Sequence, residues 1–299
     1  MISLIFAFFT AGLLSLIITF PIVITLQVLK AGQTVRAEGP SSHQVKTGTP
    51  TMAGIGFILT IIILTIILIN IDLYPQYIAL ILLTVSYATI GLVDDLLKVF
   101  RGKNQGLTFW QKIIAQTLFA AGFSLSFTGS VIHQLAIIFI IVGAANATNL
   151  TDGLNGLLAG TAGIAFMAFA VLALQRSQPE AVTFSLISAG AIFAFLYYNF
   201  PKAKVFMGDV GSLAIGAALA GLAIIMHKEL RLALIGGIFV IEALSVILQV
   251  FSYKLFKRRI FKMAPLHHHF ELMGIAEKRV VIGFWVAGII LAVIGVRVR

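Results

Sequence analysis

The stretch GLLAGTAGIAFMAFAVLAL, residues 156–174, decides the fold class, because it holds no charged residue and is long enough, as a helix, to cross a bilayer. Similar apolar runs recur along the 299-residue chain, which is 60 % hydrophobic and 11 % charged, with a mean hydropathy of +1.05. Soluble domains carry about a quarter of charged residues. The sequence therefore predicts an all-α, polytopic integral membrane protein.

About ten transmembrane helices fit the apolar runs, and they leave no room for a separate soluble domain. The first run starts at Met1 with no basic segment before it and no Ala-x-Ala-like site after it, so we expect a retained span rather than a cleaved signal. A single transmembrane domain over residues 1–299 is expected. The predicted spans are 2–29, 51–70, 76–97, 109–126, 131–148, 156–174, 181–199, 209–227, 232–256 and 280–296.

The basic residues predict an orientation. With ten spans, 16 of the 21 lysines and arginines lie in or beside one set of loops, namely 30–50, 98–108, 149–155, 200–208 and 257–279. The positive-inside rule places this set in the cytoplasm and both termini outside. Basic loops facing anionic lipid explain the net charge of +10, and a polyanionic substrate is an alternative that charge alone does not decide. No nucleic-acid partner is expected, and the absence of cysteine excludes disulfides and thiolate metal sites.

Five of the 11 acidic residues lie in or at the ends of apolar segments, where a carboxylate costs roughly 3 kcal/mol unless it faces a water-filled cavity or a cation. In GLVDDLLKVF, residues 91–100, Asp94 and Asp95 point about 100° apart on a helix, so they cannot do identical jobs. One can face a cavity while the other pairs with a neighbour such as Lys98. Adjacent carboxylates suit acid–base or nucleophilic chemistry, and a solvated helix end is the alternative. The others are Asp152, Asp209 and Glu242.

The segment NATNLTDGLNGLLAG, residues 146–160, places a polar cluster between two apolar runs. Capping a helix needs one polar side chain, so the larger number here favours a ligand site, with Thr151 or Asp152 capping the following helix. The alternative is a capped turn before a packing face made by Gly156 and Gly160. The cluster comprises Asn146, Asn149, Thr151, Asp152 and Asn155.

Two further segments combine glycine with ligand-type side chains. In FMGDVGSLAIG, residues 206–216, Asp209 stands in a glycine-flanked turn at a helix start, where a carboxylate can hold Mg²⁺; a helix cap is the alternative. In HQVKTGTPTMAGIG, residues 43–56, Lys46 and nearby backbone N–H groups can bind phosphate, with Thr51 as a further donor. A flexible loop with Pro50 in the first helical turn is the alternative reading.

Three of the six histidines, His267, His268 and His269, stand in a row in PLHHHFE, residues 265–271. Three consecutive side chains cannot easily converge on one ion, and no cysteine completes a tetrahedral set, so a zinc site is disfavoured. All these segments fall on the cytoplasmic side of the ten-span arrangement. Their shared location predicts an active centre at the cytoplasmic face, with the histidines as phosphate-directed donors.

From about residue 30 to the end, these motifs resemble those of the polyprenyl-phosphate N-acetylhexosamine-1-phosphate transferases. TPTMAG resembles the family's TPTMGG with Ala53 replacing a glycine, and VDD at 93–95 matches. NLTDGLNGL departs from the family's NLTDGLDGL at Asn155, and FMGDVGS departs from FMGDTGS at Val210. IEALSVILQV at 241–250 and PLHHHFE also match, and PLHHHFE is the segment most specific to the muramoyl-pentapeptide branch.

The resemblance implies transfer of phospho-MurNAc-pentapeptide from UDP-MurNAc-pentapeptide to undecaprenyl phosphate in the bacterial inner membrane, giving lipid I and UMP. It implies that Asp209 binds Mg²⁺, that Asp94 and Asp95 are catalytic carboxylates, and that His268 is essential. Asn155 would lack the charge that the family usually has there. The implied substrate-binding residues are Lys46, Thr51, Lys112, Asn149, Asp152, Asn155, Phe206, Gln249, His267 and His269.

Several alternatives stay open at the level of sequence. A relative that uses another UDP-sugar is one, and a transporter is another, although transporters usually place charges near the bilayer midplane in repeated halves. An aspartate could form a phospho-enzyme, or act as a base while the lipid phosphate attacks directly. Glu242 is expected to face a groove or to pair with a polar neighbour such as Gln249. A homodimer is compatible with the sequence, which does not fix the oligomeric state.

Overall fold

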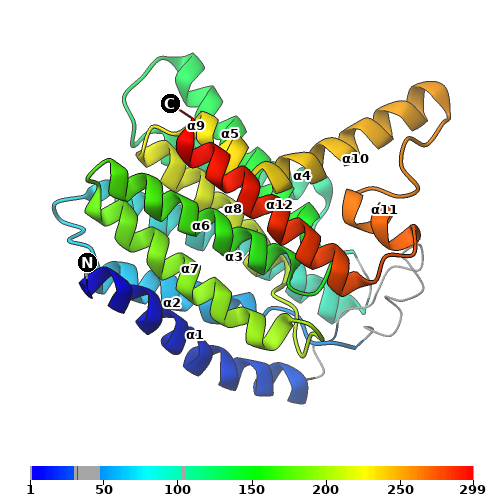
Figure 1. Ribbon diagram of the computed structural model, residues 1–299, viewed down its shortest axis with the longest axis horizontal. Helices are drawn as coiled ribbons and strands as arrows, with labels where there is room; N and C mark the ends of the chain where they lie inside the picture. The colour runs from blue at the N-terminus through cyan, green and yellow to red at the C-terminus, as the bar shows by residue number, and fades with distance from the viewer. Residues whose placement is uncertain (1, 30–31, 33–47, 103–104, 299) are drawn as a thin grey trace.

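The computed structural model describes residues 2–29, 32, 48–102 and 105–298. In these ranges its regular secondary structure is helical, apart from an isolated bridge between Gly32 and Pro50, which confirms the predicted all-α class. Most helices pack side by side in one bundle, and α10 and α11 project from it (Figure 1). The helices are α1 (Ile2–Val28), α2 (Gly54–Leu68), α3 (Pro75–Arg101), α4 (Phe109–Ser124), α5 (Val131–Thr151), α6 (Leu157–Gln175), α7 (Pro179–Asn199), α8 (Gly208–Ile225), α9 (Glu229–Ile235), α10 (Gly237–Phe256), α11 (Leu266–Leu272) and α12 (Glu277–Arg297).

Within the described residues, eight helices are long and apolar enough to cross a membrane, and α2 is a shorter apolar helix. In the most apolar window of each, 83 % of α8 and 78 % of α6 is buried, against 28 % of α1, α5 and α10. The outer helices instead expose large apolar side chains, such as Phe9 on α1 and Phe139 on α5, which suit a hydrocarbon surrounding. The protein is therefore membrane-integral, with α6 and α8 at its centre.

Close backbone contacts set α8 against its neighbours. A Cβ added to Gly54 at the start of α2 would lie 2.6 Å from the Cα of Gly211, and one added to Gly91 of α3 would collide with the backbone of Asp209. Small residues allow this approach, which is how membrane helices gain packing energy without a hydrophobic driving force. The start of α8 is thereby held between α2 and α3.

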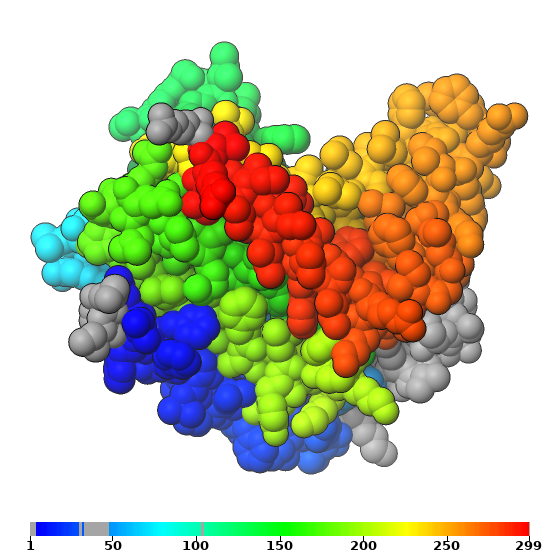
Figure 2. Space-filling view, viewed as in Figure 1, coloured from blue at the N-terminus to red at the C-terminus, as the bar shows by residue number. Residues whose placement is uncertain are grey.

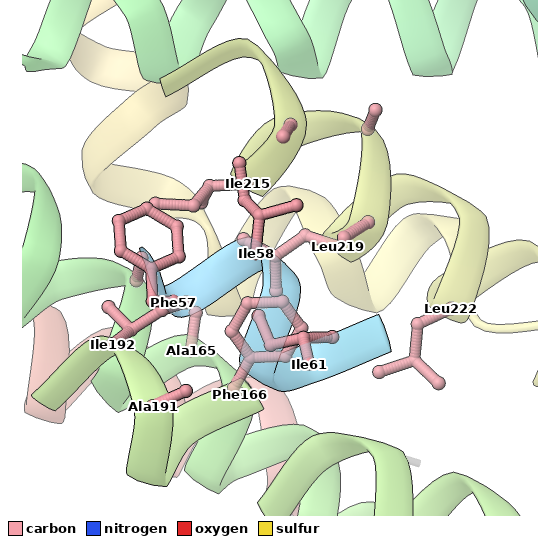
Figure 3. Packing of buried hydrophobic residues seen from close by; sticks show 14 of the residues in the cluster. Phe57, Ile58, Ile61, Ala165, Phe166, Ala191, Ile192, Ile215, Leu219 and Leu222 are labelled. Atoms are coloured by element: carbon pink, nitrogen blue, oxygen red, sulfur yellow. The ribbon is translucent and has the colours of Figure 1, made fainter. Parts of the chain in front are cut away.

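The apolar core lies behind these contacts, between α2, α6, α7 and α8. Phe57 and Ile61 of α2 lie among Phe166 of α6 and Leu219 of α8 (Figure 3), and both phenylalanines are fully buried. Phe57 meets Phe195 of α7 in an edge-to-face arrangement with ring centroids 5.4 Å apart. Such a pair adds about 1 kcal/mol to the burial of its area. The core fixes α2 relative to α8 and so positions the residues at their N-terminal ends.

Three predicted spans differ from the observed helices. Span 109–126 is the 16-residue α4 (Phe109–Ser124), which is not among the helices long enough to cross a membrane. Span 232–256 is broken at Gly236, where α9 ends and α10 begins, because two consecutive glycines weaken a helix. Span 51–70 shortens to Gly54–Leu68, because residues 50–54 bond to another segment: the Phe206 N–H donates to the Pro50 carbonyl at 2.8 Å and the Ala53 N–H to the Phe206 carbonyl at 3.1 Å. Pro50 is therefore not in the first turn of α2. The count of ten spans stays a prediction.

Candidate active site

Three carboxylates from two helices meet at one end of the bundle. Asp94 and Asp95 lie near the end of α3 and are each 1 % exposed, and Asp209 lies in the first turn of α8. One carboxylate oxygen from each lies within 4.8 Å of the others. Gly208 adopts a φ of 74°, which glycine tolerates, and a Cβ there would collide with Asp95. The glycine before Asp209 is thus what allows α8 to start against α3.

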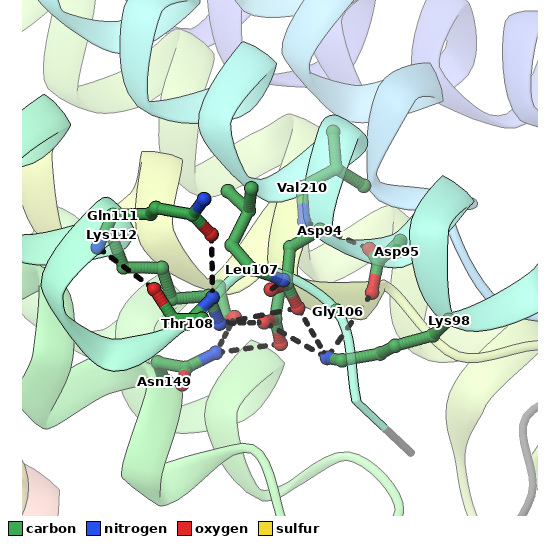
Figure 4. A network of polar contacts seen from close by, with 12 residues as sticks. Asp94, Asp95, Lys98, Gly106, Leu107, Thr108, Gln111, Lys112, Asn149 and Val210 are labelled. Atoms are coloured by element: carbon green, nitrogen blue, oxygen red, sulfur yellow. Dashed lines mark hydrogen bonds and ion pairs between the residues drawn. The ribbon is translucent and has the colours of Figure 1, made fainter. Parts of the chain in front are cut away.

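Two lysine ammonium groups sit between these carboxylates (Figure 4). Lys98 Nζ lies 2.6 Å from Asp94 Oδ2, 3.0 Å from Asp209 Oδ2 and 3.8 Å from Asp95 Oδ1. Lys112 Nζ, from α4, lies 2.6 Å from Asp209 Oδ2 and 3.2 Å from Asp94 Oδ2. Counted as ionised, three carboxylates and two ammonium groups leave a formal excess of one negative charge, which suits a cation.

The contact with Asp94 confirms Lys98 as a pairing partner of the aspartates, as the sequence predicts, but its role as a residue of the site was not predicted. Its position four residues after Asp94 places both side chains on one face of α3, and this spacing is the signal that could have identified it. Its contacts reach Asp209 on another helix, which spacing along the chain does not show.

Asp94 and Asp95 have different partners, as their different directions on α3 require. Asp94 Oδ1 accepts a hydrogen bond from the Leu107 N–H at 2.7 Å and so holds the loop between α3 and α4. Asp95 Oδ2 accepts from the Val210 N–H at 3.1 Å. Because the N-cap residue of α8, Met207, makes no side-chain bond, Asp95 supplies the cap of α8 from a different helix.

The end of α5 reaches the same centre through Asn149. Its Nδ2 donates to Asp209 Oδ1 at 2.9 Å and to Ser212 Oγ at 2.8 Å, both on α8. Asp152 follows as the C-cap residue of α5 and is partly buried. Burial raises the pKa of Asp152 to about 7, and the negative charge of Asp209 adds to the rise. Asp152 thus senses the charge of the centre, although no hydrogen bond or ion pair joins it to the three aspartates or two lysines in the described part of the chain.

The predicted helix cap by Thr151 or Asp152 is wrong. Thr151 Oγ1 donates back to the Ala147 carbonyl at 2.8 Å within α5, and the N-cap residue of α6 is Gly156, which offers no side chain. The chain makes a glycine-containing turn before α6, which moves the helix start beyond the reach of residues 151 and 152. Gly156 instead contributes its carbonyl to Trp285 Nε1–H of α12, at 3.1 Å.

Asn155 joins three segments. Its backbone N–H donates to Glu277 Oε1 at 2.9 Å and its Nδ2 donates to the Pro201 carbonyl at 3.2 Å. Its Oδ1 is buried and finds no hydrogen-bond partner among the described residues. A buried acceptor without a partner is costly, so this oxygen is available to a ligand's donor.

Thr51 and Phe206 lie on the two segments that precede α2 and α8 and that are hydrogen-bonded to each other. Thr51 is 2 % exposed, and its Oγ1 also lacks a hydrogen-bond partner among the residues that the structure describes. A Cβ at Gly208 would lie 2.8 Å from this oxygen, so Thr51 is close to Asp95 across the start of α8. Phe206 is half-buried. Lys46 lies outside the described residues.

The histidine segment is a short helix, α11, rather than the loop the sequence indicated, and its three side chains point to different partners. His267 is 1 % exposed, and a Cβ on Gly153 would collide with its ring. His268 Nδ1 lies 3.0 Å from Glu271 Oε2. His269 Nδ1 accepts from the Lys262 N–H at 3.1 Å.

Glu242 and Gln249 on α10 hold this region, each with a partner of its own. Glu242 Oε1 accepts the His267 N–H at 3.2 Å and lies 3.3 Å from His267 Nδ1, so it pairs with a polar neighbour as predicted, but with His267 rather than Gln249. Gln249 Oε1 accepts the N–H groups of Ile260 and Phe261 at 3.0 Å each. Two helical turns separate Glu242 from Gln249, and the chain that returns as residues 260–267 fills the space beside both.

Comparison with known proteins identifies the family. The glycosyl transferase family 4 matches residues 77–227, the part of the chain that carries all three aspartates. A protein named phospho-N-acetylmuramoyl-pentapeptide-transferase from Bacillus pumilus is 45 % identical over 309 residues, covering 96 % of this chain and 95 % of its own length. The chain belongs to the phospho-N-acetylmuramoyl-pentapeptide-transferase family.

Other transferases of this name show the same degree of likeness. The Bacillus subtilis protein is 45 % identical and the Bacillus licheniformis protein 46 % identical, each over 96 % of this chain and 95 % of their own length. The histidine segment lies outside the stretch that the broader glycosyl transferase family matches, whereas these relatives extend over nearly the whole chain. The likeness to these named transferases therefore extends over α10–α12, beyond the stretch that the broader family matches.

Proposed function

We propose that the protein transfers phospho-MurNAc-pentapeptide from UDP-MurNAc-pentapeptide to undecaprenyl phosphate, releasing UMP and forming lipid I. The observation that carries the proposal is the cluster of Asp94, Asp95 and Asp209 with Lys98 and Lys112 between them. A phosphoglycosyl transferase needs positioned positive charge for a diphosphate and a carboxylate near the reacting phosphorus. One acidic cluster on a membrane protein suits a soluble donor and a lipid acceptor.

The donor atoms of the cluster fit Mg²⁺. Oxygen ligands alone are present, and Mg²⁺ usually takes one or two carboxylates and leaves its other positions to water and phosphate. We assign Asp209 as the main ligand, with Asp94 or Asp95 beside it. When bound, the ion would neutralise and orient the diphosphate. It would also turn the single excess negative charge of the cluster into an excess positive one.

The protein's own residues then bind and orient the donor. Lys98 and Lys112 each approach two or more carboxylates, and entry of a diphosphate gives their N–H groups phosphate oxygens to bind instead. Asn149 keeps Asp209 in place through its amide. The unpartnered oxygens of Thr51 and Asn155 are available for donors of the nucleotide and sugar. His268 would act as a donor to phosphate from the neighbouring helix α11.

Two routes for the aspartates differ in their intermediate. In one, an oxygen of Asp94 or Asp95 bonds to the β-phosphorus, the bridging P–O bond breaks and UMP leaves; the lipid phosphate then displaces the aspartate. In the other, the lipid phosphate attacks the β-phosphorus directly while an aspartate takes its proton. Incubating the enzyme with donor but no undecaprenyl phosphate, then trapping phospho-aspartate, separates them, because only the first route gives that adduct.

The test of the proposal is lipid I formation by the purified protein. With UDP-MurNAc-pentapeptide, undecaprenyl phosphate and Mg²⁺, we expect lipid I and an equal amount of UMP. Chelation of divalent ions should stop both products, and Mg²⁺ should restore them. Release of UMP with UDP-GlcNAc as donor, and none with UDP-MurNAc-pentapeptide, would assign the protein to a different sugar instead.

We further propose that the aspartate centre faces the cytoplasm of an inner membrane, with both termini outside, in a single catalytic domain over residues 1–299. The distribution of basic residues over the loops supports this orientation. The chain has no cysteine, so a single introduced cysteine can show by its labelling which side of the membrane its position faces. In intact cells, Leu230→Cys on α9 should react with an impermeant maleimide, whereas Lys257→Cys beyond α10 should react only after permeabilisation. The reverse pattern would invert the orientation. A homodimer stays a prediction.

A further inference from the structure

A cavity of about 570 Å³ lies at the end of the bundle away from the aspartates, and its polar lining is basic. Arg176 follows α6, Arg231 lies on α9, and Arg297 ends α12; all three line the cavity. The last turn of α12 lies beside α9 in this region (Figure 1). None of the lining residues, which all belong to the described part of the chain, is acidic. The cavity therefore gathers positive charge from three separate segments.

The position of this cavity matches the opposite surface of a bilayer. Helix α6 starts beside the aspartate centre and has 19 residues, and α12, whose Glu277 bonds Asn155, has 21. At 1.5 Å per residue they are about 30 Å long, close to the thickness of the hydrocarbon core. Arg176 and Arg297 thus lie at the level of lipid headgroups.

The crowding of like charge here is unusual for this face. The ten-span arrangement places five of the 21 basic residues on this face, and three of those five line the cavity. Lys228 lies close by: partial burial lowers its pKa, the charges of Arg176 and Arg231 lower it further, and the charge of Glu229 opposes them. Arg231 is fixed because its Nη1 donates to the Val296 carbonyl at 3.1 Å. The arginines are therefore held near one another despite their repulsion.

Apolar side chains line the cavity beside the arginines, namely Leu172, Val296 and Val298. The segments that carry the arginines also expose apolar side chains, since Leu174 is 61 % exposed, Leu230 88 % and Ile294 44 %. A surface that combines basic and apolar side chains fits an amphiphilic anion better than a soluble one. We propose that this cavity binds the phosphate headgroup of an anionic phospholipid, with its acyl chains along α6 and α12. Guanidinium groups suit this role because they bind phosphate oxygens in a fixed, two-pronged geometry.

Hydrogen–deuterium exchange of the full-length protein in nanodiscs tests this. Peptides covering 172–178, 228–235 and 292–298 should exchange more slowly in phosphatidylglycerol than in phosphatidylcholine nanodiscs. Arg176→Gln with Arg297→Gln should remove the difference, and lipid titration should show about thirtyfold weaker binding, since each basic residue near an anionic surface contributes roughly fivefold. Arg176→Lys with Arg297→Lys, which keeps both charges, should retain most of it. Lys202→Gln with Lys257→Gln removes two exposed charges elsewhere and should leave these peptides unchanged.

Each outcome has a definite consequence. Equal exchange of the wild-type peptides in both lipids would overturn the proposal, and so would slowed exchange that survives the double glutamine variant. A third arm adds inorganic phosphate to phosphatidylcholine nanodiscs: equal slowing there would overturn the lipid assignment in favour of a soluble anion. Lipid I formation serves as the folding check, because the arginines lie outside the proposed active centre and their glutamine variants should keep basal activity.

Discussion

The aspartate centre and the histidine segment lie at the same end of the molecule but are held in place differently. Asp209 is fixed by two lysines and Asn149 on a helix whose backbone touches α3. The histidine segment forms the seven-residue α11, which lies beside the projecting α10 (Figure 2). Its most buried contact is the hydrogen bond from the His267 N–H to Glu242. The aspartate centre is thus formed by closely packed helices, whereas the histidine segment is a short helix held by few contacts.

The difference teaches which chemistry each region can support. Phosphoryl transfer needs charges held to within a fraction of an ångström, and the packed helix ends at Gly208 and Gly91 provide that precision. A segment with few buried contacts opens at lower free energy than the core, so it suits groups that close over a substrate. We therefore expect substitutions in the aspartate centre to abolish lipid I formation. Substitutions of residues that support α11 should reduce its rate only partly.

Asp209→Ala should have the largest effect. It removes the carboxylate that both lysines and Asn149 contact, and loss of a preorganised electrostatic group at a reacting centre costs about 10³-fold in rate. Lipid I formation at saturating substrates measures it. Asp72→Ala, at an exposed position outside the helices, is the matched control and should keep wild-type activity. Near-normal lipid I synthesis by Asp209→Ala would remove the enzyme assignment of this centre.

Besides lowering activity through the loss of a phosphate-binding group, Lys98→Met should lower stability, most of all when Mg²⁺ is absent. Its ammonium group contacts all three carboxylates, and removing one partner from a buried ionic cluster costs about 3 kcal/mol. A divalent cation can replace that charge, so Mg²⁺ should raise the melting temperature of Lys98→Met more than that of the wild type. Lys254→Met, on the exposed end of α10, is the control. Equal Mg²⁺ effects on variant and wild type would show that the ion does not share the position of Lys98.

Glu242→Leu should loosen α11 without destroying the aspartate centre. It leaves the buried His267 N–H without its acceptor, which costs about 1–3 kcal/mol, so we expect roughly tenfold slower lipid I formation and faster exchange across residues 266–272. Glu242→Gln keeps an acceptor and should fall between this variant and the wild type. Ser245→Ala, buried one turn away, should change neither measurement. Activity lost as completely as in Asp209→Ala would show that both regions are fixed equally.

The aspartate centre and the histidine segment also differ in how much of each could be predicted from the sequence. Asp209 at a glycine-flanked helix start, and Asp94 and Asp95 at a helix end, follow from local pattern, because turn chemistry and apolar periodicity are written in neighbouring residues. The contact of Glu242 with His267 joins residues 25 positions apart, between which the chain reverses direction. The residues next to either one do not predict this contact. Helix α11 was also missed, since seven residues with three histidines show no helical periodicity. Tertiary contacts decide such segments.

Substitution of Asp152 should give the smallest effect, a change in the pH dependence of stability. This change tests whether the charge of the aspartate centre influences the turn next to the histidine segment. Its pKa of about 7, against an ordinary 3.8, means that the folded chain binds this proton more tightly than the unfolded chain. The stabilisation is complete below the ordinary pKa and is lost as pH rises through about 7. Asp152→Asn cannot titrate, so its melting temperature should gain on the wild type by about 3 °C between about pH 5 and about pH 8.

Repeating this comparison in an Asp209→Asn background separates the two causes of the shift. Burial is the larger cause and the charge of Asp209 the smaller, so neutralising Asp209 should shrink the pH-dependent gain but leave most of it. A gain that vanishes would mean that the charge alone sets the proton affinity, so the aspartate centre would control the turn against which His267 packs. A gain that is unchanged would mean that the two regions are electrostatically independent. In that case substitutions in one region should add to those in the other.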